Sequence, residues 1–345
     1  MTTLLELGIL RDMTVKNLRG VNLGGWLIVE KWMTPSLFVG ATAQDEYSLL
    51  STPGGKEKIE KHQQTFITEA DFTWLQAHGI NAVRIPVGYW ILEGESPFFA
   101  AIKKLDWAMD MAKKYNLQVI IDLHGLKGSQ NGQDHSGRVG KANWYRNSQY
   151  RQETLDTLEA IARRYRDYDT FWGLQIVNEP KLGLLQLTLR RFYKEAYRLL
   201  DPILKPHTRI IFSDAFTPRL LSGAMRRHGG RVVMDVHLYH MATLFSQLLS
   251  VDWFMGKTRR RRHLLKRLSK TQPIIIGEWS GAMRHETMRR IPRDKHDAIL
   301  REYARLQMDV FSDTAGWFYW NYRTETPGIW NFYSQVEDGS IELYN

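Results

Sequence analysis

The chain has 345 residues, which fits two ordinary domains or one large α/β barrel, and 43% of them are hydrophobic, which excludes a disordered, collagen-like or low-complexity protein. It carries 47 Lys and Arg residues against 37 Asp and Glu residues, a formal net charge of +10 that raises the question of an anionic partner. It has no cysteine, which excludes a disulfide framework, a thiolate metal site and a cysteine nucleophile.

The N-terminal segment lacks the features of a secretion signal. Residues 1–7 contain no Lys or Arg, and Glu6, Arg11 and Asp12 interrupt the apolar residues around them. Nowhere do 18 apolar residues follow one another, so we expect no membrane-spanning helix. We therefore expect a cytoplasmic protein, with association to a membrane surface and export left open.

Short apolar runs rich in Val and Ile recur along the chain, each followed by a stretch of helical period. Such runs are typical of parallel strands, which are buried on both faces. The predicted strands are residues 18–23, 82–87, 118–123, 173–177, 210–212, 232–236, 274–276 and 316–320. The helix-like segments between them include residues 68–78, 103–115, 154–165, 185–200 and 297–311.

Eight strand–helix units with no Pro- or Ser-rich linker predict one (β/α)8 barrel, an α/β fold of the TIM type, in a single domain over residues 1–345. Two connections are long and contain Gly. They are residues 34–61 after the first strand and 127–146 after the third, where a barrel keeps its binding loops.

Polar or aromatic side chains end six of the predicted strands. In a barrel these ends meet at one face, where the chemistry takes place. The residues concerned are Arg84, Asp122, His124, Asn178, Glu179, Asp235, His237, Tyr239, Glu278, Trp317, Trp320 and Asn321. The sequence therefore predicts an active site at the carboxyl ends of the strands.

Two carboxylates, Glu179 and Glu278, end the fourth and seventh strands. Across a barrel mouth such side chains can face each other at about 5 Å, the separation that retaining glycoside hydrolysis requires. One would be the nucleophile and the other the acid/base, with Asn178 beside Glu179 suited to bind a sugar 2-hydroxyl. The alternative is that each Glu merely caps a helix or pairs with an Arg.

A metal-dependent hydrolase is a second interpretation of the same strand ends. Asp122, His124, Asp235, His237 and Glu278 could be ligands of a divalent metal. Metal-dependent barrels usually carry His-x-His on the first strand, whereas here that strand ends in Val-Asn-Leu at 21–23. We therefore expect neither a metal nor a cofactor.

Ordered motifs make the chain resemble the family 5 glycoside hydrolases of clan A, and most closely their exo-β-1,3-glucanase subfamily. The motifs are RGVNLGGWLIVE at 19–30, NAVRIPVGYW at 81–90, DLHG at 122–125, GSQNG at 128–132, VNEP at 177–180, HLY at 237–239 and GEW at 277–279. The resemblance implies a retaining, exo-acting β-glucosidase or β-glucanase that needs no cofactor. A β-glucosidase of glycolipids such as glucosylceramide or sterol glucoside is the alternative.

The resemblance also implies roles for individual residues. Glu179 would be the acid/base and Glu278 the nucleophile, which Arg84 would hold ionised and oriented. The remaining implied substrate-binding residues are Asn178 at the sugar 2-hydroxyl, His124, His237 and Tyr239 around the carboxylates, Trp320 under the sugar, Glu30 at the terminal sugar, and Asp134, His135 and Trp144 on the pocket wall. Gln133 stands where the exo-glucanases usually carry an aromatic that contacts the next sugar.

The excess charge lies in one segment. Residues 257–270 hold eight Lys or Arg and no acidic residue, and without them 39 basic residues remain against 37 acidic ones. We expect a basic insertion at about 253–270 that forms an amphipathic helix on the outside of the barrel. It would be a solvated face, a patch for anionic lipid or an acidic polymer, or, least in keeping with the pattern, a nucleic-acid site.

Overall fold

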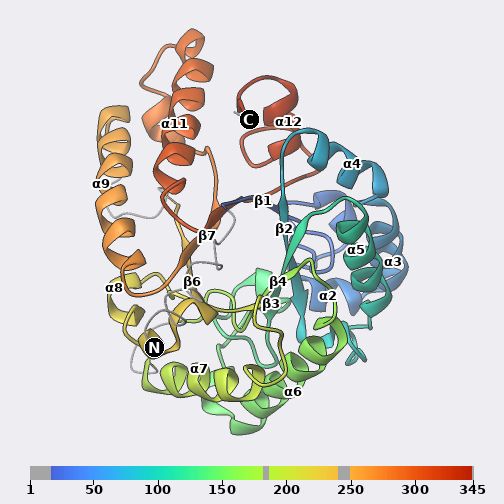
Figure 1. Ribbon diagram of the computed structural model, residues 1–345. Helices are drawn as coiled ribbons and strands as arrows, with labels where there is room; N and C mark the ends of the chain where they lie inside the picture. Colours follow the sequence, from blue (N-terminus) through green and yellow to red (C-terminus); the bar gives the residue numbers. More distant parts are fainter. Residues whose placement is uncertain (1–16, 182–185, 240–248, 344–345) are drawn as a thin grey trace, which may run out of the picture.

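Eight parallel strands form a closed barrel in chain order in the computed structural model, and helices surround it (Figure 1). The structure describes residues 17–181, 186–239 and 249–343. The strands are β1 (Leu18–Asn22), β2 (Ala82–Gly88), β3 (Gln118–Gly125), β4 (Phe171–Gln175), β5 (Arg209–Ser213), β6 (Val232–His237), β7 (Ile274–Trp279) and β8 (Gly316–Tyr319). The last strand pairs with the first, so the predicted (β/α)8 barrel is confirmed.

The helices lie outside the barrel, and five of them correspond to the segments predicted from periodicity. The helices are α2 (Glu46–Leu50), α3 (Gly55–Thr65), α4 (Glu69–Ala77), α5 (Ile102–Lys114), α6 (Ser148–Tyr165), α7 (Gln186–Leu200), α8 (Pro218–Leu221), α9 (Val251–Ser269), α10 (His285–Met288), α11 (His296–Phe311) and α12 (Phe332–Glu337). The connection at 34–61 contains α2 and most of α3. Leu185, which begins one predicted helix, and the N-terminal residues 1–16 lie outside the described residues.

An apolar layer fills the barrel at the N-terminal ends of the strands. Each strand contributes one side chain to it: Leu18, Ala82, Ile120, Trp172, Ile211, Val233, Ile275 and Phe318. Gly20 leaves the space that Phe318 occupies, because a Cβ at Gly20 would overlap the ring. The open space inside the barrel therefore lies toward the C-terminal ends of the strands.

Polar side chains replace apolar ones further along the same strands. Alternate residues of a strand point to the same side. On β3, Ile120 is therefore followed inside the barrel by Asp122 and then His124, and all three are buried. On β6, Asp235 and His237 follow Val233 in the same way. The barrel thus changes from an apolar floor to a polar mouth within two residues.

The basic segment at about 253–270, expected as an amphipathic helix on the outside of the barrel, forms part of α9, the helix between β6 and β7. Its residues Phe254, Met255, Leu265 and Leu268 are buried, and α9 packs beside α11 (Figure 1). The physical reason is the burial of this apolar stripe, which gives the helix a place in the barrel wall. Among the helices in the described ranges, none is both long and apolar enough to cross a membrane.

Candidate active site

Arg84 lies at the centre of the polar side chains at the mouth of the barrel, which we call the polar layer. It is fully buried on β2, and its guanidinium donates hydrogen bonds to side chains of three other strands and of the turn after β4. The acceptors are Gln175 Oε1 at 2.9 Å, Asn22 Oδ1 at 2.8 Å, Asn178 Oδ1 at 2.8 Å and Glu278 Oε1 at 3.1 Å, and Asp122 Oδ2 lies 3.0 Å away. A planar group with five donors in a fixed fork can orient several side chains at once.

Glu278 ends β7 and is almost fully buried. Arg84 Nη1 donates to its Oε1, and the hydroxyl of Tyr239 donates to its Oε2 at 2.8 Å. Each carboxylate oxygen therefore has its own donor, which fixes the plane of the carboxyl group across the mouth of the barrel. The predicted contact between Arg84 and Glu278 is present.

Glu179 lies in the turn that follows β4, in a left-handed backbone conformation with φ of 40°. This conformation costs a non-glycine residue on the order of 1 kcal/mol, so the surroundings must hold it. Asn131 Nδ2 donates to the carbonyl oxygen of Glu179 at 3.0 Å, and Gln130 Nε2 donates to the carbonyl oxygen of Asn178 at 3.0 Å. The loop after β3 thus fixes the turn that aims Glu179 at Glu278.

Hydrogen bonds also determine how Asn178 and His124 are oriented. Because Arg84 donates to Asn178 Oδ1, the amide nitrogen of Asn178 faces His124 Nε2 at 3.3 Å and donates to it. His124 Nδ1 then carries the proton and donates to Asp122 Oδ2 at 2.6 Å. Burial lowers the pKa of His124 well below its usual value, which is consistent with this neutral tautomer.

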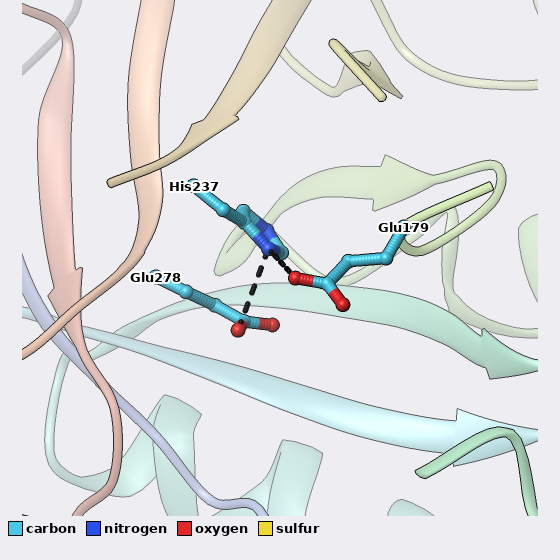
Figure 2. A group of neighbouring side chains, drawn as sticks. All are labelled: Glu179, His237 and Glu278. Atoms are coloured by element: carbon cyan, nitrogen blue, oxygen red, sulfur yellow. Dashed lines mark hydrogen bonds and ion pairs between the residues drawn. The ribbon is translucent and has the colours of Figure 1, made fainter. Parts of the chain in front are cut away.

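His237 lies between the two glutamates, as Figure 2 shows. Its Nδ1 is 2.7 Å from Glu179 Oε1 and 3.4 Å from Glu278 Oε2, and its Nε2 is 3.0 Å from Asp235 Oδ2. Both ring nitrogens therefore face carboxylates and donate, so the ring is an imidazolium. A Cβ at Gly277 would overlap the Asp235 carboxylate, so the glycine makes room for this partner.

The protonation of the two carboxyl groups is set by burial and by His237. Burial lowers the pKa of His237, but the charges of Glu278 and Asp235 outweigh it and raise that pKa well above the usual value. Burial opposes ionisation of Glu179, yet the hydrogen bond and charge of His237 lower its pKa to about 2. Burial raises the pKa of Glu278 to about 7, against the charges of His237 and Arg84. Without a bound sugar, Glu278 is therefore more readily protonated than Glu179.

A cavity of about 320 Å³ opens above the two glutamates. Its lining residues are Glu30, Trp32, His124, His135, Asn178, Glu179, Tyr239, Glu278, Trp320 and Trp330. This volume is at the lower end of ligand pockets and suits a single terminal sugar better than a long chain. Aromatic rings from three segments line its sides, so it offers both apolar faces and paired carboxylates.

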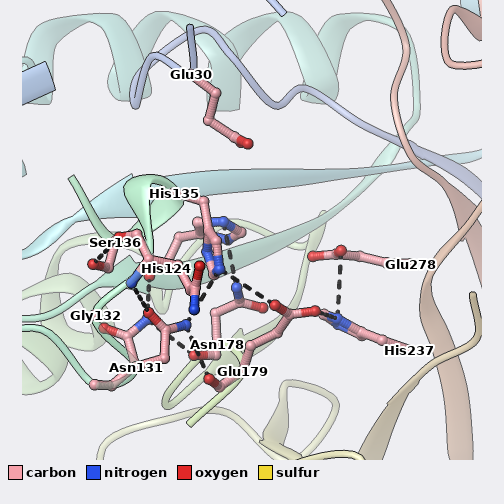
Figure 3. Close-up of polar contacts among 12 residues, drawn as sticks. Glu30, His124, Asn131, Gly132, His135, Ser136, Asn178, Glu179, His237 and Glu278 are labelled. Atoms are coloured by element: carbon pink, nitrogen blue, oxygen red, sulfur yellow. Dashed lines mark hydrogen bonds and ion pairs between the residues drawn. The ribbon is translucent and has the colours of Figure 1, made fainter. Parts of the chain in front are cut away.

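Glu30 faces this cavity from the segment that follows β1 (Figure 3). It is 5% exposed, and Trp32 Nε1 donates to its Oε2 at 2.8 Å. Burial raises the pKa of Glu30 to about 8, although the hydrogen bond from Trp32 opposes the shift. A neutral Glu30 can donate one hydrogen bond and accept others, as contact with sugar hydroxyls requires.

The structure brings together eight of the substrate-binding and positioning residues expected from the sequence, together with both glutamates. Trp144 is an exception because it is fully buried outside the cavity, where its ring packs edge-on against Tyr145 and Phe192 and its Nε1 donates to Thr154. Asp134 is not among the residues that line the cavity. The expectation for Trp144 is therefore wrong, since its long loop folds the ring into the barrel wall.

Trp32 and Trp330 belong to the cavity but were not found from the sequence. Their rings meet edge-on at 5.7 Å, and Trp330 also lies 5.8 Å from the ring of Tyr239. Trp330 follows β8 by eleven residues, so no strand-end pattern indicates it. For Trp32, the only indication in the sequence is that it lies two residues after Glu30.

A divalent cation is the remaining possibility for the three central side chains. Single donor atoms of Glu179, His237 and Glu278 lie within 4.8 Å of one another. Both nitrogens of His237 already donate to carboxylates, and Arg84 and Tyr239 already donate to Glu278. The atoms that a cation would need are thus already engaged with other side chains, and the donor set does not fit a metal ligand set.

Comparisons with known proteins give consistent relatives. The family model for cellulase (glycosyl hydrolase family 5) matches residues 47–325. A protein of Aspergillus niger named "Probable glucan 1,3-beta-glucosidase A" is 33% identical over 91% of this chain and 84% of its own length. The "Probable glucan 1,3-beta-glucosidase" of Arthroderma benhamiae is 32% identical over 93% of this chain and 88% of its own length.

Among solved structures, the rutinosidase of Aspergillus niger superposes with a TM-score of 0.80 at 20% identity, over 94% of this chain and 98% of that one. The endoglucanase Cel5A of Thermotoga maritima gives a TM-score of 0.59 at 15% identity over 93% of both chains. At these identities the two structures show that the fold is shared.

Proposed function

The chain belongs to glycosyl hydrolase family 5, and from this premise we propose that it is a retaining β-glucosidase that removes glucose from the non-reducing end of β-glucans. The observation that carries the proposal is the facing pair of glutamates. Their nearest oxygens lie within 4.8 Å of each other. Retaining enzymes hold their carboxyl groups about 5–5.5 Å apart, whereas inverting enzymes need about 6.5–9.5 Å to admit a water molecule.

Glu278 is the nucleophile in this proposal and Glu179 the acid/base. In the first step a carboxylate oxygen of Glu278 forms a bond to the anomeric carbon, the bond from that carbon to the leaving oxygen breaks, and Glu179 gives the leaving oxygen its proton. In the second step Glu179 takes a proton from water, the water oxygen bonds to the anomeric carbon, and the bond to Glu278 breaks. Glu278 is the more buried of the two, which suits the residue that becomes covalently bound.

The protons needed for this sequence lie within reach. In the free site Glu278 is more readily protonated than Glu179, whereas the reaction begins with Glu278 ionised and Glu179 protonated. Nδ1 of His237 lies between the two carboxyl groups and can exchange a proton with each. The charge of Arg84 beside Oε1 favours the ionised form of Glu278.

The contacts of the polar layer support the remaining assignments. Arg84 and Tyr239 orient Glu278, and the amide of Asn178 retains one free N–H direction for a sugar 2-hydroxyl. Trp320 stacks on His124 at 5.6 Å and offers its ring to the apolar face of a sugar. Glu30, with Trp32 and Trp330 beside it, lines the cavity where the terminal sugar would lie, which favours exo action.

The preference for glucose and for the β-1,3 linkage rests on the relatives that are named glucan 1,3-beta-glucosidases. A screen of β-1,3-, β-1,4- and β-1,6-linked oligosaccharides with product analysis tests it. Release of glucose alone from a β-1,3-oligosaccharide, with the β-anomer formed first, is the expected result. Release of longer fragments contradicts exo action, and first formation of the α-anomer contradicts retention.

The catalytic assignment is tested with aryl β-glucosides. Glu278→Gln is expected to abolish hydrolysis and to leave the fold unchanged in circular dichroism. Glu179→Gln is expected to keep the first step on 2,4-dinitrophenyl β-glucoside, whose leaving group needs no proton, and to lose phenyl β-glucoside. Full activity of the Glu278 variant would contradict the assignment.

A glycolipid substrate at a membrane surface is a second candidate, and the cationic face of α9 favours it. Arg262 and Lys266 pair with Asp309 and Asp313 of the α11 region. Arg259, Arg260, Arg267 and Lys270 are exposed, and no ion pair to them is present in the described part of the chain. Such a face is attracted to anionic lipid by about 1 kcal/mol per basic side chain.

Sedimentation with vesicles tests this second candidate. The wild type is expected to sediment with vesicles of 30% phosphatidylserine and to remain in solution with phosphatidylcholine alone. Replacing Arg259 and Arg260 by Gln should release it, whereas replacing Arg163 and Arg166 on the opposite part of the barrel by Gln should not. Equal sedimentation of both double variants would contradict a membrane role of α9.

A further inference from the structure

The acid/base candidate Glu179 has a second histidine beside it. His135 lies in the 3-10 turn Asp134–Ser136 of the loop after β3, and its Nε2 is 3.4 Å from Glu179 Oε2. His237 contacts the other oxygen, Oε1, at 2.7 Å. Figure 3 shows the two imidazole rings on different sides of the Glu179 carboxyl group.

Asn131 determines what the Nε2 atom of His135 can do. Asn131 Oδ1 accepts from the backbone N–H of Gln133 at 2.9 Å, so its amide nitrogen must point the other way. That nitrogen donates to the carbonyl oxygen of Glu179 at 3.0 Å and lies 3.3 Å from His135 Nε2. An N–H group is therefore always directed at Nε2, and it is accepted only when Nε2 carries no proton.

Two protonation states fit this geometry. In one, His135 is neutral with its proton on Nδ1, Nε2 accepts from Asn131, and Glu179 holds a proton on Oε2. In the other, Nε2 is protonated and Glu179 is a carboxylate. His135 Nδ1 is buried and has no hydrogen-bond partner among the described residues, so nothing there fixes one state.

We propose that His135 is a positioning residue that shares the catalytic proton with Oε2 of Glu179. This inference rests on the proposed function. The acid/base must be protonated when the glycosidic bond breaks and ionised when water attacks. His135 fits each stage, because its neutral form faces the protonated carboxyl group and its charged form faces the carboxylate.

Several titratable and polar groups surround this pair. His124 on β3 lies 5.2 Å from the ring of His135, and Asp134 is its neighbour in the chain. His237 contacts Glu179 from β6, and Glu278 from β7 lies beyond it. Glu30 and Trp32 face the same cavity from the segment after β1. Each oxygen of the Glu179 carboxyl group thus faces one histidine.

Loss of proton delivery and general damage to the site should have different effects on the kinetics. Nε2 of His135 is a second basic atom 3.4 Å from Oε2 of Glu179, where it can hold the proton that Glu179 gives to the leaving group. Removing the imidazole of His135 should lower activity only on substrates whose leaving group needs that proton. It should also move the alkaline limb of the kcat/KM profile to lower pH.

The experiment compares His135→Asn with the wild type on two β-glucosides. For phenyl β-glucoside we expect kcat/KM to fall about tenfold and the alkaline limb to move down by about one pH unit. For 2,4-dinitrophenyl β-glucoside we expect less than about a twofold change. Equal losses on both substrates, or an unmoved alkaline limb, would overturn the proposal.

His135→Gln separates proton sharing from hydrogen bonding, because an amide can donate to Oε2 but cannot take its proton. It is expected to behave like His135→Asn, and recovery of the wild-type pH profile would overturn the proposal. Lys141→Gln, an exposed residue of the same loop, is the control and should match the wild type. A wild type that hydrolyses neither β-glucoside contradicts the proposed function instead, which keeps the two failures apart.

Discussion

The carboxylate of Asp235 lies 3.0 Å from Nε2 of His237, and this pair keeps the ring between the two glutamates charged. The other oxygen of Asp235 accepts from the backbone N–H of Gly277 at 2.7 Å. The carboxylate is therefore fixed to β7, the strand that carries Glu278. One buried group on β6 thus links the nucleophile's strand to the ring that contacts the acid/base.

Asp235→Asn is expected to lower kcat/KM on phenyl β-glucoside by one to two orders of magnitude, equal to about 1.4–2.8 kcal/mol of transition-state stabilisation. The amide carries no charge, and because its oxygen would accept from the N–H of Gly277, its amino group would face Nε2 of His237. The ring beside Glu179 then loses a stabilising negative charge. Steady-state kinetics checks this. Asp214→Asn, at a buried carboxyl just beyond β5, is the matched control and should keep most of the activity.

Arg84→Met should destabilise the fold as well as abolish activity. The substitution leaves Asp122 and Glu278 without their cation and Asn22, Gln175 and Asn178 without their donor. Removing one partner of a buried ion pair costs about 3–5 kcal/mol. Urea unfolding measures this loss, and a variant as stable as the wild type would contradict the central position of Arg84.

Glu46 gives a pH-dependent stability prediction. It is buried on α2 and accepts from the backbone N–H of Val29 at 2.9 Å, and burial raises its pKa to about 8. Between its unfolded value near 4.5 and about 8, the folded chain binds one more proton than the unfolded chain, so stability falls as the pH rises. Glu46→Gln removes this dependence.

The unfolding free energy of Glu46→Gln, relative to the wild type, should therefore rise by up to about 1.4 kcal/mol per pH unit between pH 5 and pH 8. Urea unfolding of both proteins at four pH values measures the difference. Glu57→Gln, on the exposed side of α3, is the control and should show no such trend. A constant difference across this range would contradict a raised pKa of Glu46.

Substitutions of Trp330 and Trp144 are expected to have different effects, because Trp330 lines the cavity and Trp144 lies in the core. Trp330→Ala should raise KM for a β-1,3-oligosaccharide about tenfold with a smaller change in kcat, because it removes an apolar wall of the cavity. Trp144→Phe should leave KM unchanged and lower the unfolding free energy by about 2 kcal/mol or more, since the smaller ring leaves a cavity in the core and loses the hydrogen bond to Thr154. A raised KM of the Trp144 variant would indicate that Trp144 contributes to the wall of the cavity.

The fold could be predicted from the sequence because its signals are local. Each strand is a short apolar run, and six of the eight predicted strands end in polar or aromatic residues. Glu179, Glu278, Arg84 and His237 could therefore be placed at one face of the barrel without a structure. The alternation of a strand then puts Asp122 and Asp235 on the same side as the residues they support. Because both faces of each strand are buried, few other arrangements of the strands are compatible with this pattern.

The parts that the sequence could not determine depend on how long loops fold. Trp144 and Trp330 are both aromatic residues of long connections, yet one is buried in the barrel wall and the other lines the cavity. Side-chain type is the same in both cases, and only the path of the backbone separates them.

The sequence by itself determined the barrel, the pair of glutamates and the strand ends that carry them, since a period of two residues and a strand's end are properties of the chain alone. Only the tertiary structure decided the protonation and the partners of that pair. A pKa depends on burial and on charges contributed by other strands, so the imidazolium of His237, the second histidine at Glu179 and the raised pKa of Glu278 arise when the barrel closes.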